Sequence, residues 1–433
     1  MRRKALAVSA GLSLLFLVVY GGCNWLTAQR HDVGTFFFAW ERAIPFVPLA
    51  ILPYLSIDLF FVAAPFLCRS ERELRILAGR IALAILAAGV CFILFPLRFA
   101  FPRPETSGPL GFLFDQFRSL DAPYNLAPSL HAALGLLLFD FYFRLSREVG
   151  RVAVLVWFAF MAVSPLLTRQ HHVIDIATGL ALAGGCFYFI RAEGMPRWSG
   201  VRGGLVGNYY MMAALVLGLF ALFVGSWTLL LWWPALACLL VGLAYLGFGP
   251  GIFGKKDGRL PLYSRFVLGP CLAGQWLSFL HYRRQCAAWN EVVPGVWIGR
   301  KLSAREALEV IGAGVASVLD LTAEFSEAKP FRRLRYRNEA ILDLTAPTLE
   351  QLHEMAQFVA EGARNGIVYV HCKIGYSRSV AAVASYLMLS GQAGSVGEAV
   401  ARIRQVRPTV VVRPEIETVL ALLQEELTRS VAA

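Results

Sequence analysis

Long apolar runs dominate the first 250 residues of the chain, and they constrain its fold more than any other feature. A helix that crosses a bilayer needs about 20 mainly apolar residues. We interpret eight runs as membrane-spanning helices, at 5–27, 45–67, 81–101, 130–145, 151–168, 172–190, 209–225 and 227–250. Only 16% of the 433 residues are charged, whereas soluble proteins carry about 25%. The composition therefore excludes a wholly soluble protein.

The first run follows Arg2, Arg3 and Lys4, as the apolar core of a secretory signal peptide would. It is longer than such a core, and no clear small-x-small cleavage site follows it. We therefore expect an uncleaved helix.

The distribution of positive charge predicts how the helices are oriented. Residues 290–433 are balanced in charge, so the net charge of +12 arises from residues 1–289. Short cytoplasmic loops of membrane proteins are enriched in Lys and Arg. With an inner N-terminus, the inner segments hold sixteen basic residues and the outer segments six, which are Arg30, Arg42, Arg98, Arg103, Arg118 and Arg169. We expect an inner-membrane (plasma-membrane) protein with both termini in the cytoplasm, and no compact basic stripe indicates nucleic-acid binding.

The pattern changes after Pro250. Residues 251–289 place Leu272, Trp276 and Phe279 at helical spacing among basic residues, which suits either a helix in the membrane interface or a linker packed on the next domain. From Glu291 onward, short apolar strands alternate with amphipathic helices, as in a soluble α/β domain. The expected domains are a six-helix membrane domain (1–195), two additional membrane helices (196–250), an interfacial linker (251–289) and a soluble domain (290–433).

The most informative motif runs from Val370 to Ser379 and reads Val-His-Cys-Lys-Ile-Gly-Tyr-Ser-Arg-Ser. An apolar strand precedes it and an apolar helix follows, so that backbone N–H groups and a helix N-terminus surround one point. That geometry binds a phosphate dianion. The same field stabilises a thiolate, which makes Cys372 a candidate nucleophile. The planar fork of Arg378 is suited to two phosphate oxygens.

The H-C-x5-R-S pattern resembles the cysteine-dependent dual-specificity phosphatases over roughly residues 290–433. The resemblance implies that Cys372 forms a phosphocysteine, that Ser379 helps the thiolate leave, and that His371 orients the loop. The family also uses an acid on a separate loop. Asp343, in Leu342–Thr348, is our candidate for this acid, and Asp320 is a weaker one. The expected fold is a central, mostly parallel sheet in an α/β phosphatase domain that follows a polytopic helical membrane bundle.

Lys373 follows the nucleophile directly and favours a substrate with additional phosphates, such as a lipid head group. The run that includes Lys373 and Gly375, together with the Asp343 loop and Arg413, is similar to the phosphatidylglycerophosphate phosphatase branch. We expect Lys373 and Gly375 to bind substrate. If Lys373 instead points to solvent, protein phosphotyrosine is the alternative substrate.

A second group of polar residues lies in three segments that are expected outside the membrane: 98–104, 127–131 and 168–175. A neutral imidazole attacks phosphorus and is displaced again, so His171 is a candidate nucleophile. Asp175, four residues on, is placed to orient this imidazole. His131 is the candidate general acid and base. Phosphate oxygens would be neutralised by Arg103, Arg169 and Ser129.

These segments resemble the type 2 phosphatidic acid phosphatase superfamily over roughly residues 45–195. In that family a Lys precedes the Arg-Pro of the first motif. Here its position is occupied by Pro96, and Arg98 is the candidate substitute. The Pro-Ser-Leu-His and His-x3-Asp segments are closer to the inositol-phosphotransferase branch, so hydrolysis and head-group transfer both remain open. His172 is an alternative nucleophile to His171.

Three further features complete the prediction. Asp58 lies within a span and either lines a substrate cavity or bridges helices, whereas Asp140 is expected to pair with Arg144. The eight cysteines lack metal-site spacing, and we expect neither a metal nor a cofactor.

Together these patterns predict a membrane phosphoester enzyme with lipid phosphates as substrates. It would have an outward-facing histidine site and a cytoplasmic cysteine site. The alternatives are a tyrosine or dual-specificity protein phosphatase anchored by a degenerate lipid-sensing domain, and a lipid scramblase or transporter with an enzymatic tail.

Overall fold

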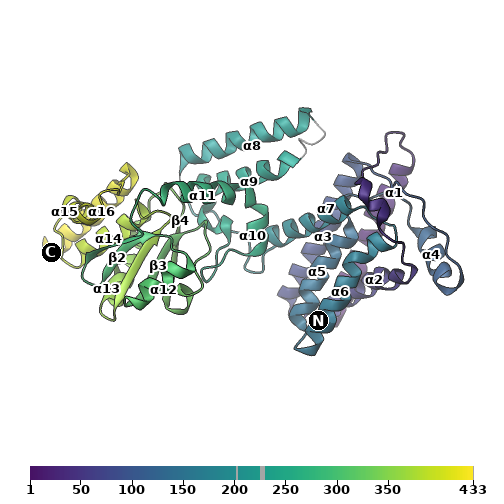
Figure 1. The fold of residues 1–433 in the computed structure, drawn as a ribbon, viewed down its shortest axis with the longest axis horizontal. Coiled ribbons are helices and arrows are strands. Elements are labelled where there is room, and N and C mark those ends of the chain that lie inside the picture. The colour runs from purple at the N-terminus through teal and green to yellow at the C-terminus, as the bar shows by residue number, and fades with distance from the viewer. Residues whose placement is uncertain (201–202, 225–229, 433) are drawn as a thin grey trace. The chain divides into compact units, whose positions relative to one another are not determined.

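The computed structural model describes the chain except for residues 201–202, 225–229 and 433. It divides into two compact units, an N-terminal unit (Met1–Gly194) and a C-terminal unit (Met195–Ala433). The first is helical, and the second combines a helical segment with an α/β domain (Figure 1). The expected fold class, a helical membrane bundle followed by an α/β domain, is confirmed.

The N-terminal unit is a bundle of apolar helices. Its elements are α1 (Arg2–Ala28), η1 (Ala39–Ala43), η2 (Pro48–Ala50), α2 (Ile51–Leu67), α3 (Glu71–Leu94), α4 (Gly108–Leu120), α5 (Leu130–Leu145), α6 (Val149–Leu167) and α7 (Val173–Phe189). α5 contacts α2, α3, α6 and α7. The buried core therefore draws on several helices, with Ile85, Ala133 and Leu138 fully inside it.

Within the parts of the chain that the structure describes, six helices are long and apolar enough to cross a membrane. They are Arg2–Ala28, Pro48–Leu67, Glu71–Leu94, Glu148–Leu167, Gly204–Val224 and Trp232–Phe253. α5 and α7 are apolar but shorter, at 16 and 17 residues. Residues 225 and 227–229 of the expected last two spans, and Arg202 of the charge count, lie outside the described residues.

The helix expected at 81–101 is displaced along the sequence. α3 begins ten residues earlier, at Glu71, where the Ser70 hydroxyl accepts a hydrogen bond from the Glu73 N–H. Its first three turns contain charged residues, among them Arg72, Arg75 and Arg80, which interrupt the apolar run. Arg80 is buried and lies 3.6 Å from Asp140, which also forms the expected pair with Arg144 at 2.5 Å.

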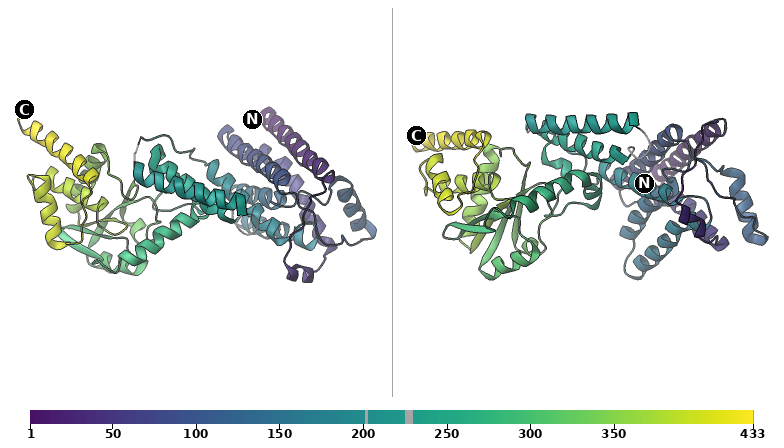
Figure 2. Two further views of the ribbon diagram at one scale, coloured as in Figure 1. Left: turned by 90° about the horizontal axis from the view of Figure 1, so that it is seen from above. Right: turned by 45° about the horizontal axis from the view of Figure 1, so that its top comes forward.

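The C-terminal unit begins with a helical hairpin. Helices α8 (Gly204–Val224) and α9 (Trp232–Leu243) lie side by side (Figures 1 and 2). The chain continues through η4 (Ala244–Phe248), η5 (Gly249–Phe253), α10 (Leu262–Val267) and α11 (Gly269–Tyr282). In α11, Phe279 packs with Phe325 and Ile374 of the α/β domain. Of the two interpretations of residues 251–289, these contacts favour the packed linker.

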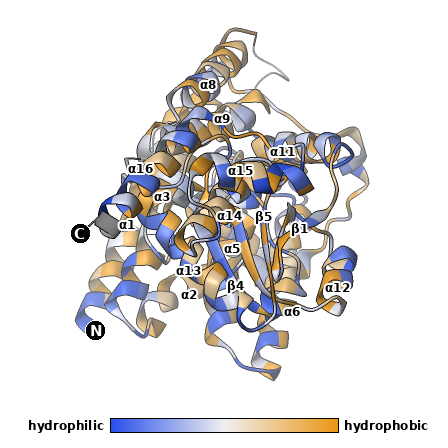
Figure 3. Ribbon diagram, turned by 90° about the vertical axis from the view of Figure 1, so that its left-hand side faces the viewer, coloured by the Kyte–Doolittle hydropathy of each residue, from blue (hydrophilic) through white to orange (hydrophobic). Residues whose placement is uncertain are grey.

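The α/β domain is built on a five-stranded sheet of order β1-β2-β5-β3-β4. The strands are β1 (Trp289–Val293), β2 (Val296–Arg300), β3 (Val315–Thr322), β4 (Arg335–Ile341) and β5 (Ile367–Cys372). Only β1, among the described strands, pairs antiparallel. β5 is apolar and buried, whereas the edge strand β4 is hydrophilic (Figure 3).

Five helices accompany this sheet in the described part of the domain: α12 (Ala304–Gly312), α13 (Leu349–Ala363), α14 (Arg378–Leu389), α15 (Val396–Val406) and α16 (Pro414–Ala432). α14 is buried along nearly its whole length and contacts α13, α15, α16 and β5. Because β3, β4 and β5 run parallel, their carboxyl ends meet at one edge of the sheet. Glu324 and Asp343 lie in the loops after β3 and β4, and Cys372 is the last residue of β5, so the topology brings these three residues together.

Candidate active sites

The first candidate site surrounds Cys372, the last residue of β5. Its buried Sγ accepts a hydrogen bond from the Gly375 N–H at 3.2 Å, and Ser379 Oγ lies 3.5 Å away. Burial raises the pKa of this thiol, but the charge of Arg378 and the hydrogen bonds from Ser379 and Gly375 outweigh that effect and lower the pKa overall. A lowered pKa favours the thiolate, so Cys372 remains the candidate nucleophile.

The loop from Cys372 to Arg378, which we call the catalytic loop, is held from behind by a buried arginine. Arg407 donates from Nε to the Gly375 carbonyl at 3.0 Å and from Nη2 to the Ile374 carbonyl at 2.8 Å. Gly375 has φ +82°, and a Cβ there would lie 2.5 Å from the Gly299 carbonyl oxygen. Sequence reasoning missed Arg407, since nothing in the local pattern around it indicates contact with a loop 32 residues away.

Arg378 is fixed by a carboxylate that sequence reasoning also missed. Its guanidinium donates to both oxygens of Glu324, at 2.7 and 3.1 Å, and to the Ile341 carbonyl at 2.8 Å. Both side chains are buried. Glu324 follows the carboxyl end of β3, and a search for acidic residues just after parallel strands would have found it.

Asp343 lies between two cations. Its Oδ1 accepts from Arg378 at 3.1 Å, and its Oδ2 accepts from Lys373 at 3.0 Å. Burial raises the pKa of Asp343, but these two cations outweigh burial, so the pKa is lowered. The residue expected as the general acid is thus a carboxylate in the ligand-free site.

Asp320, the weaker candidate acid, is part of a different cluster. It is fully buried on β3, where its carboxylate accepts from Lys255 Nζ at 2.5 Å, from the Tyr336 hydroxyl at 2.7 Å and from the Thr322 N–H at 2.8 Å. Both carboxylate oxygens of Asp320 therefore already accept hydrogen bonds. Asp320 is therefore a structural anion and is unsuited to proton transfer at Cys372.

His371 precedes the nucleophile and is fully buried. Its Nδ1 lies 3.2 Å from the Cys372 carbonyl oxygen, and its Nε2 lies 2.7 Å from Glu327. Burial lowers the pKa of His371, but Glu327 outweighs it and raises the pKa overall. Asp320, Glu327 and His371 are close enough to share a metal ion. Because the Lys255 ammonium already supplies a positive charge to Asp320, we assign no metal there.

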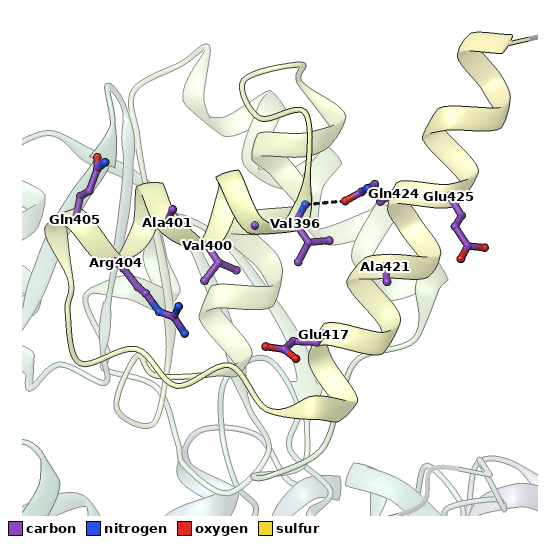
Figure 4. A pocket seen from close by; sticks show the side chains of 10 residues that line it. Val396, Val400, Ala401, Arg404, Gln405, Glu417, Ala421, Gln424 and Glu425 are labelled. Atoms are coloured by element: carbon purple, nitrogen blue, oxygen red, sulfur yellow. Dashed lines mark hydrogen bonds between the residues drawn. The ribbon is translucent and has the colours of Figure 1, made fainter.

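A cavity of about 740 Å³ opens at the catalytic loop. One side is lined by Asp343, Cys372, Lys373 and Arg378, and the other by residues of α8, α9 and α11. A separate cavity of about 870 Å³ lies between α15 and α16 (Figure 4). Its described lining has no cysteine or histidine, so we place the chemistry in the first cavity.

The second candidate site is in the N-terminal unit, where α7 begins. His172 is the N-cap residue of this helix, and its backbone N–H donates to Asp175 Oδ2 at 2.7 Å. His171 lies just before the helix, with its Nδ1 3.5 Å from the same oxygen. His171 and Asp175 are therefore adjacent, although the shorter contact of Asp175 is with the backbone.

His172 is not available as a nucleophile. Its Nδ1 lies 2.9 Å from Glu41 Oε2, its Nε2 accepts from the Ala100 N–H at 3.2 Å, and its ring stacks on Phe99. The side chain is fully buried. Sequence reasoning missed Glu41, whose contact with His172 leaves His171 as the candidate nucleophile.

The structure brings only some of the expected residues to this site. The Ser129 N–H donates to the Asp175 carbonyl at 2.9 Å, while the Ser129 hydroxyl accepts from the Ala132 N–H and caps α5. His131 lies with Nε2 3.3 Å from the Met161 carbonyl oxygen, stacked on Tyr54. None of the three arginines has a described hydrogen bond or ion pair with His171 or Asp175: Arg103 contacts Asp121, Arg169 lies over Phe101, and Arg98 is exposed.

Asp58, the acidic residue within α2, has no hydrogen bond or ion pair with any other residue in the described parts of the chain. It lies on an exposed face of that helix. Two roles were expected for Asp58, lining a substrate cavity or bridging two helices. The described contacts of Asp58 include no such bridge.

Three buried polar atoms near the start of α7 lack hydrogen-bond partners among the described residues: His171 Nδ1, Asp175 Oδ1 and Gln170 Oε1. Buried polar groups are normally paired. Each of these atoms can form a hydrogen bond with a polar ligand, and His171 remains the candidate nucleophile of this site.

Comparisons with known proteins identify a domain around each candidate site. Residues 48–189 match the PAP2 superfamily model, and residues 296–426 match the dual specificity phosphatase catalytic domain model. The chain is 39% identical over 93 residues to phosphatidylglycerophosphatase and protein-tyrosine phosphatase 1 of Mus musculus, and 29% identical over 143 residues to protein phosphatase Slingshot homolog 3 of Rattus norvegicus.

The matched segments cover 21% and 33% of this chain, and they span about half (48%) and about a fifth (22%) of those two relatives. A crystal structure of PTPMT1 in complex with PI(5)P aligns at 25% identity with a TM-score of 0.30, covering 34% of this chain and 99% of that one. On the two family matches, the chain joins a PAP2-superfamily domain to a dual-specificity phosphatase catalytic domain.

Proposed function

We propose that the chain is a membrane phosphatase with two phosphoester sites, a cysteine site at Cys372 and a histidine site at His171, both acting on lipid phosphates. One observation is the main support for the cysteine site. The Cys372 thiol with its lowered pKa, the buried guanidinium of Arg378 and the carboxylate of Asp343 all line one cavity. The relative that shares 39% identity is named as both a phosphatidylglycerophosphatase and a protein-tyrosine phosphatase.

At the cysteine site, the Cys372 thiolate attacks phosphorus and the bond to the leaving alkoxide breaks. The loop N–H groups and Arg378 hold the phosphoryl oxygens. When the phosphate dianion pairs with Arg378, it takes over the charge that now lowers the pKa of Asp343. The pKa of Asp343 then rises, so that this residue protonates the leaving oxygen.

In the second half of the reaction, water attacks the phosphocysteine. Asp343 accepts the proton of this water, and the thiolate leaves while Ser379 donates a hydrogen bond to it. When inorganic phosphate leaves, the charges of Arg378 and Lys373 again lower the pKa of Asp343, which releases its proton to solvent, and the enzyme returns to its starting charge state.

A lipid phosphate is the favoured substrate because of where Lys373 points. Its side chain is only 9% exposed, and Nζ contacts Asp343 and Gln275 at the cavity rather than solvent. A cation beside the phosphate-binding loop suits a head group that carries a second phosphate.

At the histidine site, His171 would attack a lipid phosphate or phosphodiester and form a phosphohistidine, with Asp175 stabilising the imidazolium. The bond from phosphorus to the lipid alcohol breaks, and His131 would protonate this leaving alcohol. Transfer to water or to a head-group alcohol completes the reaction, so both hydrolysis and transferase activity are included. For His131 to exchange a proton there, its ring must turn away from the Met161 carbonyl.

The sidedness of the two sites belongs to the same proposal. Both termini and the Cys372 domain lie in the cytoplasm, and the His171 site faces outward across a plasma membrane. The excess of basic residues in the inner loops supports this topology, and a reduced cytoplasm keeps Cys372 active.

The full-length protein, reconstituted in phosphatidylcholine vesicles, tests this function through phosphate release. We expect Cys372→Ser to abolish release from phosphatidylglycerophosphate, and His171→Ala to abolish a separate release or exchange from phosphatidic acid. Neither substitution should affect the other reaction. Rapid turnover of a phosphotyrosine peptide, with no turnover of either lipid, would instead support the protein phosphatase alternative.

A further inference from the structure

The cavity at Cys372 is built from two parts of the chain with different chemistry. Its floor is the catalytic loop with three cations, Lys373, Arg378 and Arg413. The opposite wall comes from helices that precede the α/β domain: Tyr210 of α8, Pro234 and Cys238 of α9, and Pro270, Cys271, Gly274, Gln275, Ser278 and Tyr282 of α11. One end of the cavity therefore suits a phosphate, and the other suits an apolar group.

The helices that form this wall are suited to a bilayer. α8 and the segment Trp232–Phe253, which contains α9, both meet the length and hydropathy of a membrane span. Large apolar side chains cover their outer faces, among them Leu215, Phe220 and Phe223. Pro234 lies about 13 Å along α9 from the helix end at Leu243, at 1.5 Å per residue. The length of α9 between Pro234 and Leu243 is thus similar to the thickness of one leaflet, which is about half of the ~30 Å hydrocarbon core.

Contacts fix the hairpin of α8 and α9, together with α11, onto the catalytic residues. The Tyr245 hydroxyl donates to the Asp343 carbonyl at 2.8 Å, at the base of the hairpin. Lys373 Nζ donates to Gln275 Oε1 of α11 at 2.8 Å. The wall and the floor therefore form one site, with polar contacts at its centre.

We propose that this cavity is a lateral entrance through which a single membrane phospholipid with a phosphomonoester head group reaches Cys372. The phosphate binds the catalytic loop, and the glycerol and the first part of the acyl chains lie against α8, α9 and α11. This inference rests on the proposed phosphatase function of Cys372 and adds the route and the apolar recognition of its substrate. A phosphorylated protein side chain has no acyl chains that would contact α8, α9 and α11.

Gly274 offers a test that leaves the catalytic loop untouched. It lines the cavity, and a Cβ at this position meets no atom within 4 Å. The substitution Gly274→Leu therefore fills cavity space without a clash at Cβ. Gly22→Leu in α1 is the matched control, because Gly22 is an exposed helical glycine whose Cβ also meets nothing within 4 Å.

The experiment uses the full chain in phosphatidylcholine vesicles, in a His171→Ala background so that only Cys372 contributes. Phosphate release is measured from phosphatidylglycerophosphate in the vesicles, from its acyl-free head group and from p-nitrophenyl phosphate. We expect the vesicle lipid to be the best of the three substrates. Gly274→Leu should lower its kcat/KM by about 10-fold or more, whereas p-nitrophenyl phosphate turnover and all activities of Gly22→Leu stay unchanged.

Two results would overturn the lateral entrance while leaving the phosphatase function intact. One is a lipid rate that Gly274→Leu does not change, and the other is an acyl-free head group that is hydrolysed as well as the vesicle lipid. A parallel loss of lipid and p-nitrophenyl phosphate turnover in Gly274→Leu would also count against it, because the wall would then act on the catalytic loop itself. If Cys372→Ser leaves p-nitrophenyl phosphate turnover intact, the proposed function itself fails.

Discussion

Glu324 holds Arg378 through two hydrogen bonds, of 2.7 and 3.1 Å, in a region where both side chains are almost completely buried. These contacts hold the guanidinium of Arg378 near Cys372, in the lining of the same cavity, before any substrate arrives. A preorganised cation of this kind stabilises transition-state charge without a reorganisation cost. Glu324 is thus a positioning residue for the proposed reaction.

We expect Glu324→Gln to lower kcat/KM for phosphomonoesters by about 10²-fold, because a shift of about 1 Å in a positioned group has such an effect. The loss should appear in both KM and kcat, since Arg378 binds the phosphate in the ground state and in the transition state. Steady-state kinetics with p-nitrophenyl phosphate measure this split. Unchanged kinetics, with Arg378→Ala inactive, would show that Arg378 needs no such support.

The lowered pKa of Cys372 gives a prediction for thiol reactivity. Hydrogen bonds to a thiolate favour the charged form, and Ser379 is one of the donors. Ser379→Ala should therefore raise the pKa of Cys372 and move the pH midpoint of its alkylation by iodoacetamide upward. Cys286→Ser, which leaves Cys372 in place, is the control. A midpoint that Ser379→Ala leaves in place, or lowers, contradicts this account.

The ion pair between Lys255 and Asp320 attaches the linker to the α/β domain. Their Nζ and Oδ2 atoms are 2.5 Å apart, and both side chains are buried. We expect Lys255→Met to destabilise the C-terminal unit by about 3–5 kcal/mol, because it leaves an unpaired buried carboxylate. Thermal unfolding measures the loss. Lys329→Met, at an exposed position, should have little effect, and equal effects of the two substitutions would disprove the role of the ion pair.

The parts of this arrangement that the sequence predicts are those encoded by adjacent residues. Cys372, Arg378 and Ser379 lie within eight positions, so that one strand–loop–helix pattern places them together. Glu324 and Arg407 contact the same loop from 54 and 32 residues away, and no local pattern reveals such pairings. A sequence also does not show that the charge of Lys255 is buried beside Asp320.

Contacts between residues far apart in the sequence also determine the histidine site. His171 and His172 are adjacent in sequence and chemically identical. The His-x3-Asp spacing favours His171, but it does not show what His172 contacts. Glu41, 131 residues away, occupies Nδ1 of His172 and leaves His171 as the candidate. The expected position of α3 was wrong for a related reason, since the buried Arg80 pairs with a carboxylate on α5 and is not at a helix boundary.

Asp175 allows the two proposed sites to be separated experimentally. Its Oδ2 accepts from the His172 N–H at 2.7 Å and lies 3.5 Å from His171 Nδ1. Asp175→Asn keeps the size of the side chain but removes the charge that would stabilise a phosphorylated or protonated imidazole. We expect turnover at the histidine site to fall by about 10²-fold or more, by analogy with carboxylates that orient catalytic histidines.

Turnover at Cys372 supplies the internal control for this substitution, because Asp175 lies in the other compact unit of the chain. The measurement compares phosphate release or head-group exchange from phosphatidic acid with hydrolysis of p-nitrophenyl phosphate by the same preparation. A selective loss of the phosphatidic acid reaction assigns the charge of Asp175 to His171. Equal rates in Asp175→Asn and the unsubstituted protein would mean that Asp175 serves only as the cap of α7, and the nucleophilic role of His171 would lose its main support.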